Sequence, residues 1–152
     1  MKDVHILLVE DNEGDIVLTM EALREARIRN SIDVVRNGEE ALQFLHKEGP
    51  FREAQTPDII FLDINLPRID GTEILAMIKN DDVLKVIPVI MLTTSDAERD
   101  ILKSYYNHAN CYITKPVDLD KFIEVVQSIK NFWINIVKLP KPLDECPTPN
   151  NH

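Results

Sequence analysis

The sequence predicts an α/β protein in which helices cover both faces of a parallel β-sheet. Short apolar segments alternate five times with segments that have the spacing of amphipathic helices, and this alternation is typical of βαβ units. The central apolar segments are continuous rather than alternating, as is expected for strands buried on both faces.

The N-terminal half contains the first two strand–helix pairs. Residues 4–9 form a short run of branched apolar side chains, which predicts a buried strand. An i, i+4, i+7 apolar pattern then predicts a helix over about residues 14–27. A second strand over 32–35 stops at an Asn-Gly turn signal, and the apolar positions between 41 and 45 mark a second helix.

The second half begins with a polar, Gly- and Pro-containing stretch, which predicts a loop of about ten residues. Residues 59–62 form the strongest strand pattern and end at Asp63, and Pro88 precedes a further strand over 89–92. The remaining expected elements are a fifth strand over 111–114 and helices around 74–78, around 101–105 and over 119–136.

The chain is acidic, with 26 Asp and Glu against 17 Lys and Arg and a formal net charge of -9. Such a charge disfavours nucleic-acid backbones and anionic membranes, and it favours divalent cations. Two cysteines cannot form a disulfide framework. No apolar run approaches the length of a membrane span, and the N-terminus does not match a signal peptide. We therefore expect a cytoplasmic protein without direct nucleic-acid or membrane contacts.

The C-terminal residues differ from the rest in being rich in proline. We expect one domain over residues 1–139 and a flexible tail over residues 140–152. Because we expect no output domain after residue 140, the output should be a surface of the domain itself.

Polar residues that can carry chemistry stand where four of the five expected strands end. They are Glu10, Asp11, Asp63, Thr93 and Lys115. Ligand sites of doubly wound sheets form beyond the carboxyl ends of the strands, so these residues should meet at one edge. Crowded carboxylates repel one another, and Mg²⁺, which prefers oxygen ligands, relieves that repulsion. The set predicts a Mg²⁺ site with an aspartate nucleophile and with hydroxyl and ammonium donors for phosphoryl oxygens.

Each of these residues taken alone could also have a purely structural role, because an acid after a strand often serves only as a helix cap. All five at the right strand ends favour the functional explanation. The sequence motifs of other kinds of site are absent. There is no GxGxxG motif of a dinucleotide site after the first strand, no Walker A sequence and no nucleophile elbow. The 4 histidines are dispersed along the chain.

Five segments of the chain form a specific combination: Leu8-Val9-Glu10-Asp11, Asp63-Ile64-Asn65-Leu66-Pro67, Asp70-Gly71, Pro88-Val89-Ile90-Met91-Leu92-Thr93 and Tyr112-Ile113-Thr114-Lys115-Pro116. Through these segments the chain, over about residues 3–130, resembles the receiver domain of two-component response regulators. The resemblance implies a flavodoxin-like sheet of five parallel strands in the order 2-1-3-4-5.

The resemblance also implies a role for each matching residue at the metal site. Asp63 corresponds to the phosphoacceptor aspartate of the family. Asp11 corresponds to the main metal carboxylate and Glu10 to the second acid, which acts directly or through water. The backbone carbonyl of Asn65 corresponds to the remaining protein ligand of Mg²⁺.

Four further residues match the family's switch and phosphate-binding positions. Thr93 corresponds to the switch hydroxyl and Tyr112 to the switch aromatic residue. Lys115 corresponds to the phosphate-binding lysine, and its bond to Pro116 is cis in the family.

A narrower resemblance, carried by the long loop before Asp58 and by residues 131–140, is to stand-alone regulators paired with bacteriophytochrome-type histidine kinases. Surplus apolar residues beyond residue 130 either fold back on the core or form an interface. We favour a homodimer whose interface includes Phe132 and Trp133.

The leading hypothesis is therefore a non-enzymatic phosphorylation switch, which leaves autodephosphorylation open. One alternative is a Mg²⁺-dependent phosphohydrolase with an aspartyl-phosphate intermediate. However, the second acid that haloacid-dehalogenase-like phosphatases need would stand at Asn65. The other alternative is a phosphorylation-independent scaffold, against which the intact set of site residues argues.

Overall fold

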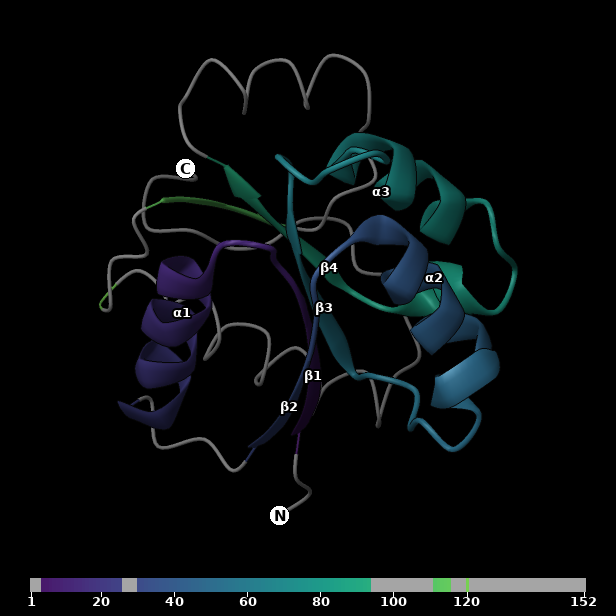
Figure 1. Ribbon diagram of the computed structural model, residues 1–152, viewed down its shortest axis with the longest axis horizontal. Helices are drawn as coiled ribbons and strands as arrows, with labels where there is room; N and C mark the ends of the chain where they lie inside the picture. The colour runs from purple at the N-terminus through teal and green to yellow at the C-terminus, as the bar shows by residue number, and fades with distance from the viewer. Residues whose placement is uncertain (1–3, 26–29, 94–110, 116–119, 121–152) are drawn as a thin grey trace, which may run out of the picture.

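A computed structural model of the protein describes residues 4–25, 30–93, 111–115 and 120, and it contains one five-stranded sheet (Figure 1). Its strands are β1 (Val4–Val9), β2 (Asn30–Val35), β3 (Ile59–Asp63), β4 (Val89–Thr93) and β5 (Cys111–Thr114). All neighbouring strands are parallel, and the order is β2-β1-β3-β4-β5. The predicted fold class and strand order are confirmed.

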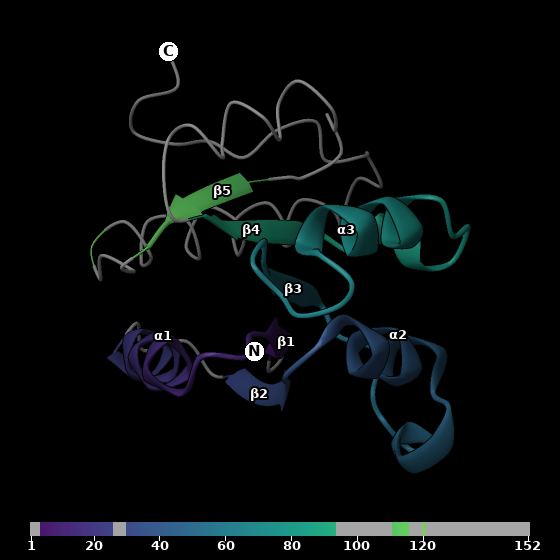
Figure 2. The same ribbon diagram turned by 45° about the horizontal axis from the view of Figure 1, so that its top comes forward.

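The helices of the described part of the chain lie on both faces of the sheet. They are α1 (Glu13–Glu25), α2 (Gly38–His46) and α3 (Gly71–Lys79), with short 3₁₀ turns η1 (Gly49–Phe51) and η2 (Leu84–Val86). Helix α1 covers one face, and α2 and α3 cover the other (Figures 1 and 2). None of these helices has the length and apolar character needed to cross a bilayer. The two helices expected after β4 and β5, with the extension of the second, fall outside the described residues, as does the expected tail.

The core consists of two apolar layers that alternate along each strand. In β1, Leu7 and Val9 pack toward α2 and α3, whereas Ile6 and Leu8 pack toward α1. The same alternation continues in β3 and β4, and their described side chains are buried throughout. Burial on both faces explains why these strands appear in the sequence as unbroken apolar runs.

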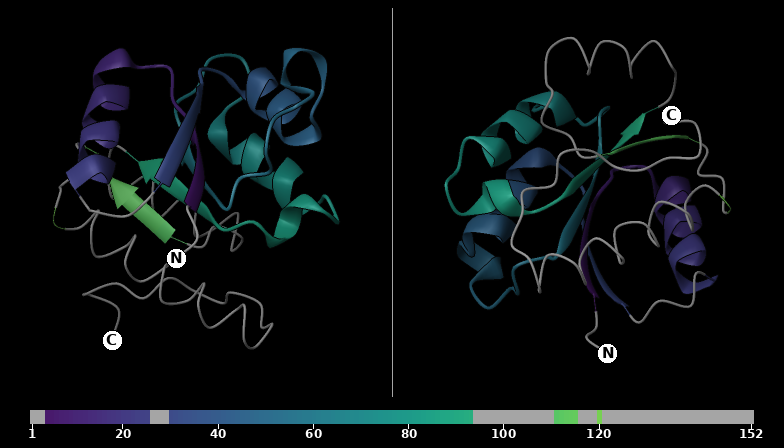
Figure 3. Two further views of the ribbon diagram at one scale, coloured as in Figure 1. Left: turned by 90° about the horizontal axis from the view of Figure 1, so that it is seen from below. Right: turned by 180° about the vertical axis from the view of Figure 1, so that it is seen from behind.

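The parallel register brings the carboxyl ends of the strands to one edge of the sheet. Val9 pairs with Val35 and Leu62, Asp63 pairs with Leu92, and each strand leaves the sheet near this row. The two further views of Figure 3 show the same layering from below and from behind. Residues that follow the strands are therefore neighbours in space although they are far apart in the chain.

Candidate functional site

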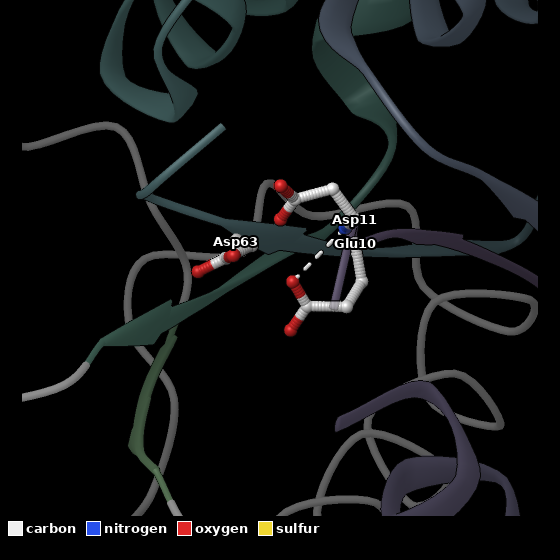
Figure 4. A group of neighbouring side chains, drawn as sticks. All are labelled: Glu10, Asp11 and Asp63. Atoms are coloured by element: carbon white, nitrogen blue, oxygen red, sulfur yellow. Dashed lines mark hydrogen bonds between the residues drawn. The ribbon is translucent and has the colours of Figure 1, made fainter. Parts of the chain in front are cut away.

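Three carboxylates meet at the carboxyl edge of the sheet. Glu10 and Asp11 directly follow β1, and Asp63 is the last residue of the adjacent strand β3. One oxygen from each of the three side chains lies within 4.8 Å of the others, and Figure 4 shows them facing a common space. Glu10 is 0% and Asp63 is 2% exposed, whereas Asp11 is exposed. The cluster is therefore buried at its base and open to solvent at Asp11.

Backbone hydrogen bonds fix the two strand ends that carry the carboxylates. The Glu10 amide donates to the Val35 carbonyl at 3.0 Å and so extends the pairing of β1 with β2. The Asp11 amide donates to Oε2 of Glu10 at 3.1 Å. After β3, the Ile64 amide donates to the Leu92 carbonyl at 3.2 Å, which holds the chain beside β4 one residue beyond Asp63.

Gly71 allows α3 to begin directly against the backbone of Asp63 and Ile64. The Gly71 amide donates to the Ile64 carbonyl at 2.9 Å. A β-carbon at position 71 would overlap the Asp63 carbonyl oxygen and lie 2.7 Å from Cα of Ile64. Asp70 caps this helix, because its side chain accepts a hydrogen bond from the Thr72 amide at 2.6 Å. The Asp70-Gly71 pair thus ties the start of α3 to the strand end that carries Asp63.

Lys115 places an ammonium among the carboxylates. The residue follows β5, and its amide donates to the Thr93 carbonyl at 2.5 Å. Its Nζ donates to Glu10 Oε1 at 2.5 Å and to Asp15 Oδ2 at 3.0 Å, and it lies 3.1 Å from Asp63 Oδ1. The Lys115 side chain is only 11% exposed, so this ion-pair network is largely shielded from water.

The crowding of these charges shifts the pKa values of two groups. Burial raises the pKa of Glu10, the neighbouring Asp63 raises it further, Lys115 opposes both effects, and the result is about 8. Burial alone lowers the pKa of Lys115, but its hydrogen bonds to Glu10 and Asp15 and the charge of Asp63 bring it above its usual range. One ammonium is thus insufficient to compensate the buried carboxylates. A divalent cation with oxygen ligands fits this site because it supplies the missing positive charge.

Thr93 adds a buried hydroxyl at the same edge of the sheet. It is the last residue of β4, is 0% exposed, and its Oγ1 has no hydrogen-bond partner among the described residues. An unpaired buried hydroxyl costs free energy unless a ligand pairs with it. Thr93 can therefore donate to, or accept from, an oxygen that enters the site.

The structure brings five of the predicted site residues to one edge, namely Glu10, Asp11, Asp63, Thr93 and Lys115. Asn65 is exposed two residues beyond β3, and its amide donates to Asp63 Oδ1 at 3.3 Å. Tyr112 belongs to β5, but its side chain is outside what the structure describes. Pro116, Phe132 and Trp133 also lie outside the described residues.

Asp15 is a contact residue that the sequence patterns did not identify. It lies in the first turn of α1, four residues after Asp11, and it shares the Lys115 ammonium with Glu10. The only signal was its place just after Asp11, at the expected start of the first helix and near the same edge of the sheet. An acid in a first helical turn is so common, however, that the spacing alone did not single it out.

Comparison with known proteins agrees with this geometry. The family model described as the response regulator receiver domain matches residues 6–127. The chain is 44% identical over 135 residues to "Response regulator Rcp1" of Synechocystis sp., an alignment that covers 89% of this chain and 92% of that protein.

Two solved structures are similar to the chain over nearly its whole length. One is the phosphorylated cyanobacterial phytochrome response regulator RcpA, with a TM-score of 0.74 and 46% identity, covering 92% of this chain and 100% of that one. The other is the Mn²⁺-bound form of response regulator Rcp1, with a TM-score of 0.71 and 40% identity, covering 96% of this chain and 99% of that one.

Proposed function

The chain belongs to the response regulator receiver domain family, and from that membership we propose that Asp63 accepts a phosphoryl group from a histidine kinase in a Mg²⁺-dependent reaction. Receiver domains are phosphoacceptors that bind a divalent metal. One observation carries the assignment to particular residues: the oxygens of Glu10, Asp11 and Asp63 lie within 4.8 Å of one another, with Lys115 Nζ 3.1 Å from Asp63.

Asp63 is proposed as the nucleophile because it stands at the centre of the site. One oxygen of its carboxylate forms a bond to phosphorus while the bond from phosphorus to the donor histidine nitrogen breaks. The electron pair of the broken bond returns to the imidazole. The Lys115 ammonium, at 3.1 Å from Asp63 Oδ1, is close enough to pair with an oxygen of the transferred phosphoryl group. The free Thr93 hydroxyl is proposed to hydrogen-bond to another phosphoryl oxygen.

Glu10, Asp11 and Asp63, with the backbone carbonyl of Asn65, are proposed to hold Mg²⁺. When bound, the cation compensates the negative charge of the carboxylates and of the phosphoryl oxygens. Asp11 is proposed as the main ligand. Support comes from the donor set, which is entirely oxygen, and from the Mn²⁺ that the solved form of Rcp1 holds.

The partner we propose is a phytochrome-type histidine kinase. Three of the similar solved structures are named as phytochrome or bacteriophytochrome response regulators, at 46%, 40% and 38% identity. The acidic net charge of -9 supports the absence of direct nucleic-acid binding. Autodephosphorylation, in which water attacks the aspartyl phosphate, is proposed as the route by which the signal decays.

The remaining proposals concern the organisation of the protein. We propose a receiver domain over residues 1–139 and a flexible tail over residues 140–152. Signalling is proposed to proceed through a conformational change linked to Thr93 and Tyr112. The proposed output surface is a homodimer interface that includes Phe132 and Trp133, and the proposed location is the cytoplasm.

Labelling with a small phosphodonor tests the phosphoacceptor. The wild-type protein is incubated with acetyl phosphate in Mg²⁺ or in chelator, and the phosphorylated fraction is measured by intact-mass spectrometry. Labelling should require Mg²⁺ and be abolished in Asp63→Asn. Asp82→Asn is the matched control, since the Asp82 side chain is 96% exposed in an ion pair with Lys85 away from the site, and it should label normally. Full labelling of Asp63→Asn would refute the proposal.

A further inference from the structure

Asp15 contacts the site without belonging to the set of metal ligands proposed above. Lys115 Nζ lies among three carboxylates, with distances of 2.5 Å to Glu10, 3.0 Å to Asp15 and 3.1 Å to Asp63. An ammonium has three N–H donors. The contacts to Glu10 and Asp15 have hydrogen-bond geometry, so Asp15 takes one of these donors.

A divalent cation held by the carboxylate cluster would change this sharing of the ammonium. Glu10 and Asp63 are in the carboxylate cluster that could hold a cation, together with Asp11, whereas Asp15 is not. Oxygens that face a cation are less able to accept hydrogen bonds from Lys115, and the cation repels the ammonium. Of the three carboxylates around Lys115, only Asp15 keeps its full ability to pair with it.

Asp15 is well placed for this task because its backbone is fixed at the start of α1. Its amide donates to Asn12 Oδ1 at 2.9 Å, and the Ile16 amide donates to the Asn12 carbonyl at 3.0 Å. The positive end of the helix dipole also favours a negative side chain in this turn. The Asp15 side chain is 30% exposed and the Lys115 side chain 11%, so their ion pair is more shielded than a surface pair.

We propose that Asp15 is a positioning residue that holds the Lys115 ammonium beside the site when a divalent cation engages Glu10 and Asp63. The ammonium then stays within reach of a phosphoryl group on Asp63 without competing with the cation for its carboxylates. This inference deepens the proposed function and rests on it.

A double-mutant cycle on Mg²⁺ affinity tests the link between Asp15 and Lys115. Calorimetric titration with MgCl₂ is carried out on the wild type, Asp15→Asn, Lys115→Ala and the double variant. Asp15→Asn should weaken Mg²⁺ binding by about fivefold, because Lys115 then stays on Glu10 and Asp63 and competes with the cation. In the Lys115→Ala background the same change should alter the affinity by less than about twofold.

The first turn of α1 offers a matched control for simple loss of charge. Glu13 pairs with Arg36 at 2.6 Å rather than with Lys115, and its side chain is 69% exposed. Glu13→Gln should therefore leave Mg²⁺ affinity within about twofold of the wild type. Asp15→Glu should restore part of the loss seen in Asp15→Asn. An unchanged affinity in Asp15→Asn, or an equal loss in both backgrounds, would overturn the proposal. If Lys115→Ala does not fold, Lys115→Met takes its place in the cycle.

Phosphorylation provides a second readout. At saturating Mg²⁺, Asp15→Asn should react with acetyl phosphate about fivefold more slowly than the wild type, with the label still on Asp63. A wild-type rate in Asp15→Asn would contradict the positioning role. Absence of label on the wild type would instead refute the proposed function, and the Mg²⁺ cycle would still decide the role of Asp15.

Discussion

Replacing Gly71 with alanine would place a β-carbon against the backbone of the strand end that carries Asp63. The new carbon would overlap the Asp63 carbonyl oxygen, lie 3.0 Å from the Asp63 carbonyl carbon and lie 2.7 Å from Cα of Ile64. Carbon atoms in contact prefer separations of about 3.5–4.0 Å. The start of α3 must therefore move by about 1 Å from β3, or the end of β3 must move by the same amount.

The cost of this movement has two sources. Forcing an extra carbon into a closely packed position typically costs about 1–3 kcal/mol. The hydrogen bond from the Gly71 amide to the Ile64 carbonyl, now 2.9 Å long, would also weaken, and such a bond contributes about 0.5–1.5 kcal/mol. We expect Gly71→Ala to lower the free energy of unfolding by about 2–4 kcal/mol. Since domains are usually stable by about 5–15 kcal/mol, the variant should still fold.

Urea unfolding of Gly71→Ala and the wild type measures this loss as a lower midpoint at an unchanged slope. Gly14→Ala is the control, because a β-carbon there would meet only Asn12 Oδ1, at 3.3 Å, the end of a flexible side chain. Its stability should stay within about 1 kcal/mol of the wild type. Gly71→Ala should also bind Mg²⁺ more weakly, since Asp63 is displaced. A Gly71→Ala variant with the stability and the Mg²⁺ affinity of the wild type would refute the reasoning.

Three further predictions concern the metal, the pH and the assembly. Asp11→Ala should weaken Mg²⁺ binding by more than about tenfold, or about 1.4 kcal/mol, in a calorimetric titration, and an unchanged affinity would contradict its role. Without a bound metal, the pKa of Glu10 is about 8 in the folded protein and about 4.5 in the unfolded chain. Between these two pH values the folded protein keeps a proton that the unfolded chain has lost, so the free energy of unfolding should fall as the pH rises from about 4.5 to about 8. Urea unfolding in chelator should show a flatter pH dependence for Glu10→Gln. Sedimentation should show a wild-type dimer that is weakened by Phe132→Ala and Trp133→Ala, and a wild-type monomer at tens of micromolar would count against the interface.

The strands and the main site residues could be predicted because each unbroken apolar run marks a buried strand and the polar residue that ends the run marks the edge of the sheet. Residues 59–62 are apolar without interruption because both faces of β3 are buried, and the run ends where Asp63 reaches the edge of the sheet. The same change from apolar to polar occurs at Glu10 after β1. Parallel strands bring such ends together, so the convergence of the site followed from the fold class alone.

The contact between Asp15 and Lys115 could not be predicted in the same way. The two residues are 100 positions apart, and their pairing depends on how α1 packs beside the edge of the sheet. The complete burial of Glu10, which raises its pKa, likewise depends on neighbouring elements. Within the expected loop before β3, the short turn η1 begins at Gly49, which has a positive φ of 55°, and no apolar periodicity marks such a turn.

Chemical mapping of the phosphorylated residue tests the proposed phosphoacceptor most directly. Borohydride reduces an aspartyl phosphate to homoserine, so the modified position can be read by peptide mass spectrometry. After treatment of the wild-type protein with acetyl phosphate and Mg²⁺, homoserine should appear at position 63, and it should be absent when a chelator replaces Mg²⁺. Homoserine at another aspartate, or none at all in the presence of Mg²⁺, would contradict the assignment of Asp63 as the phosphoacceptor.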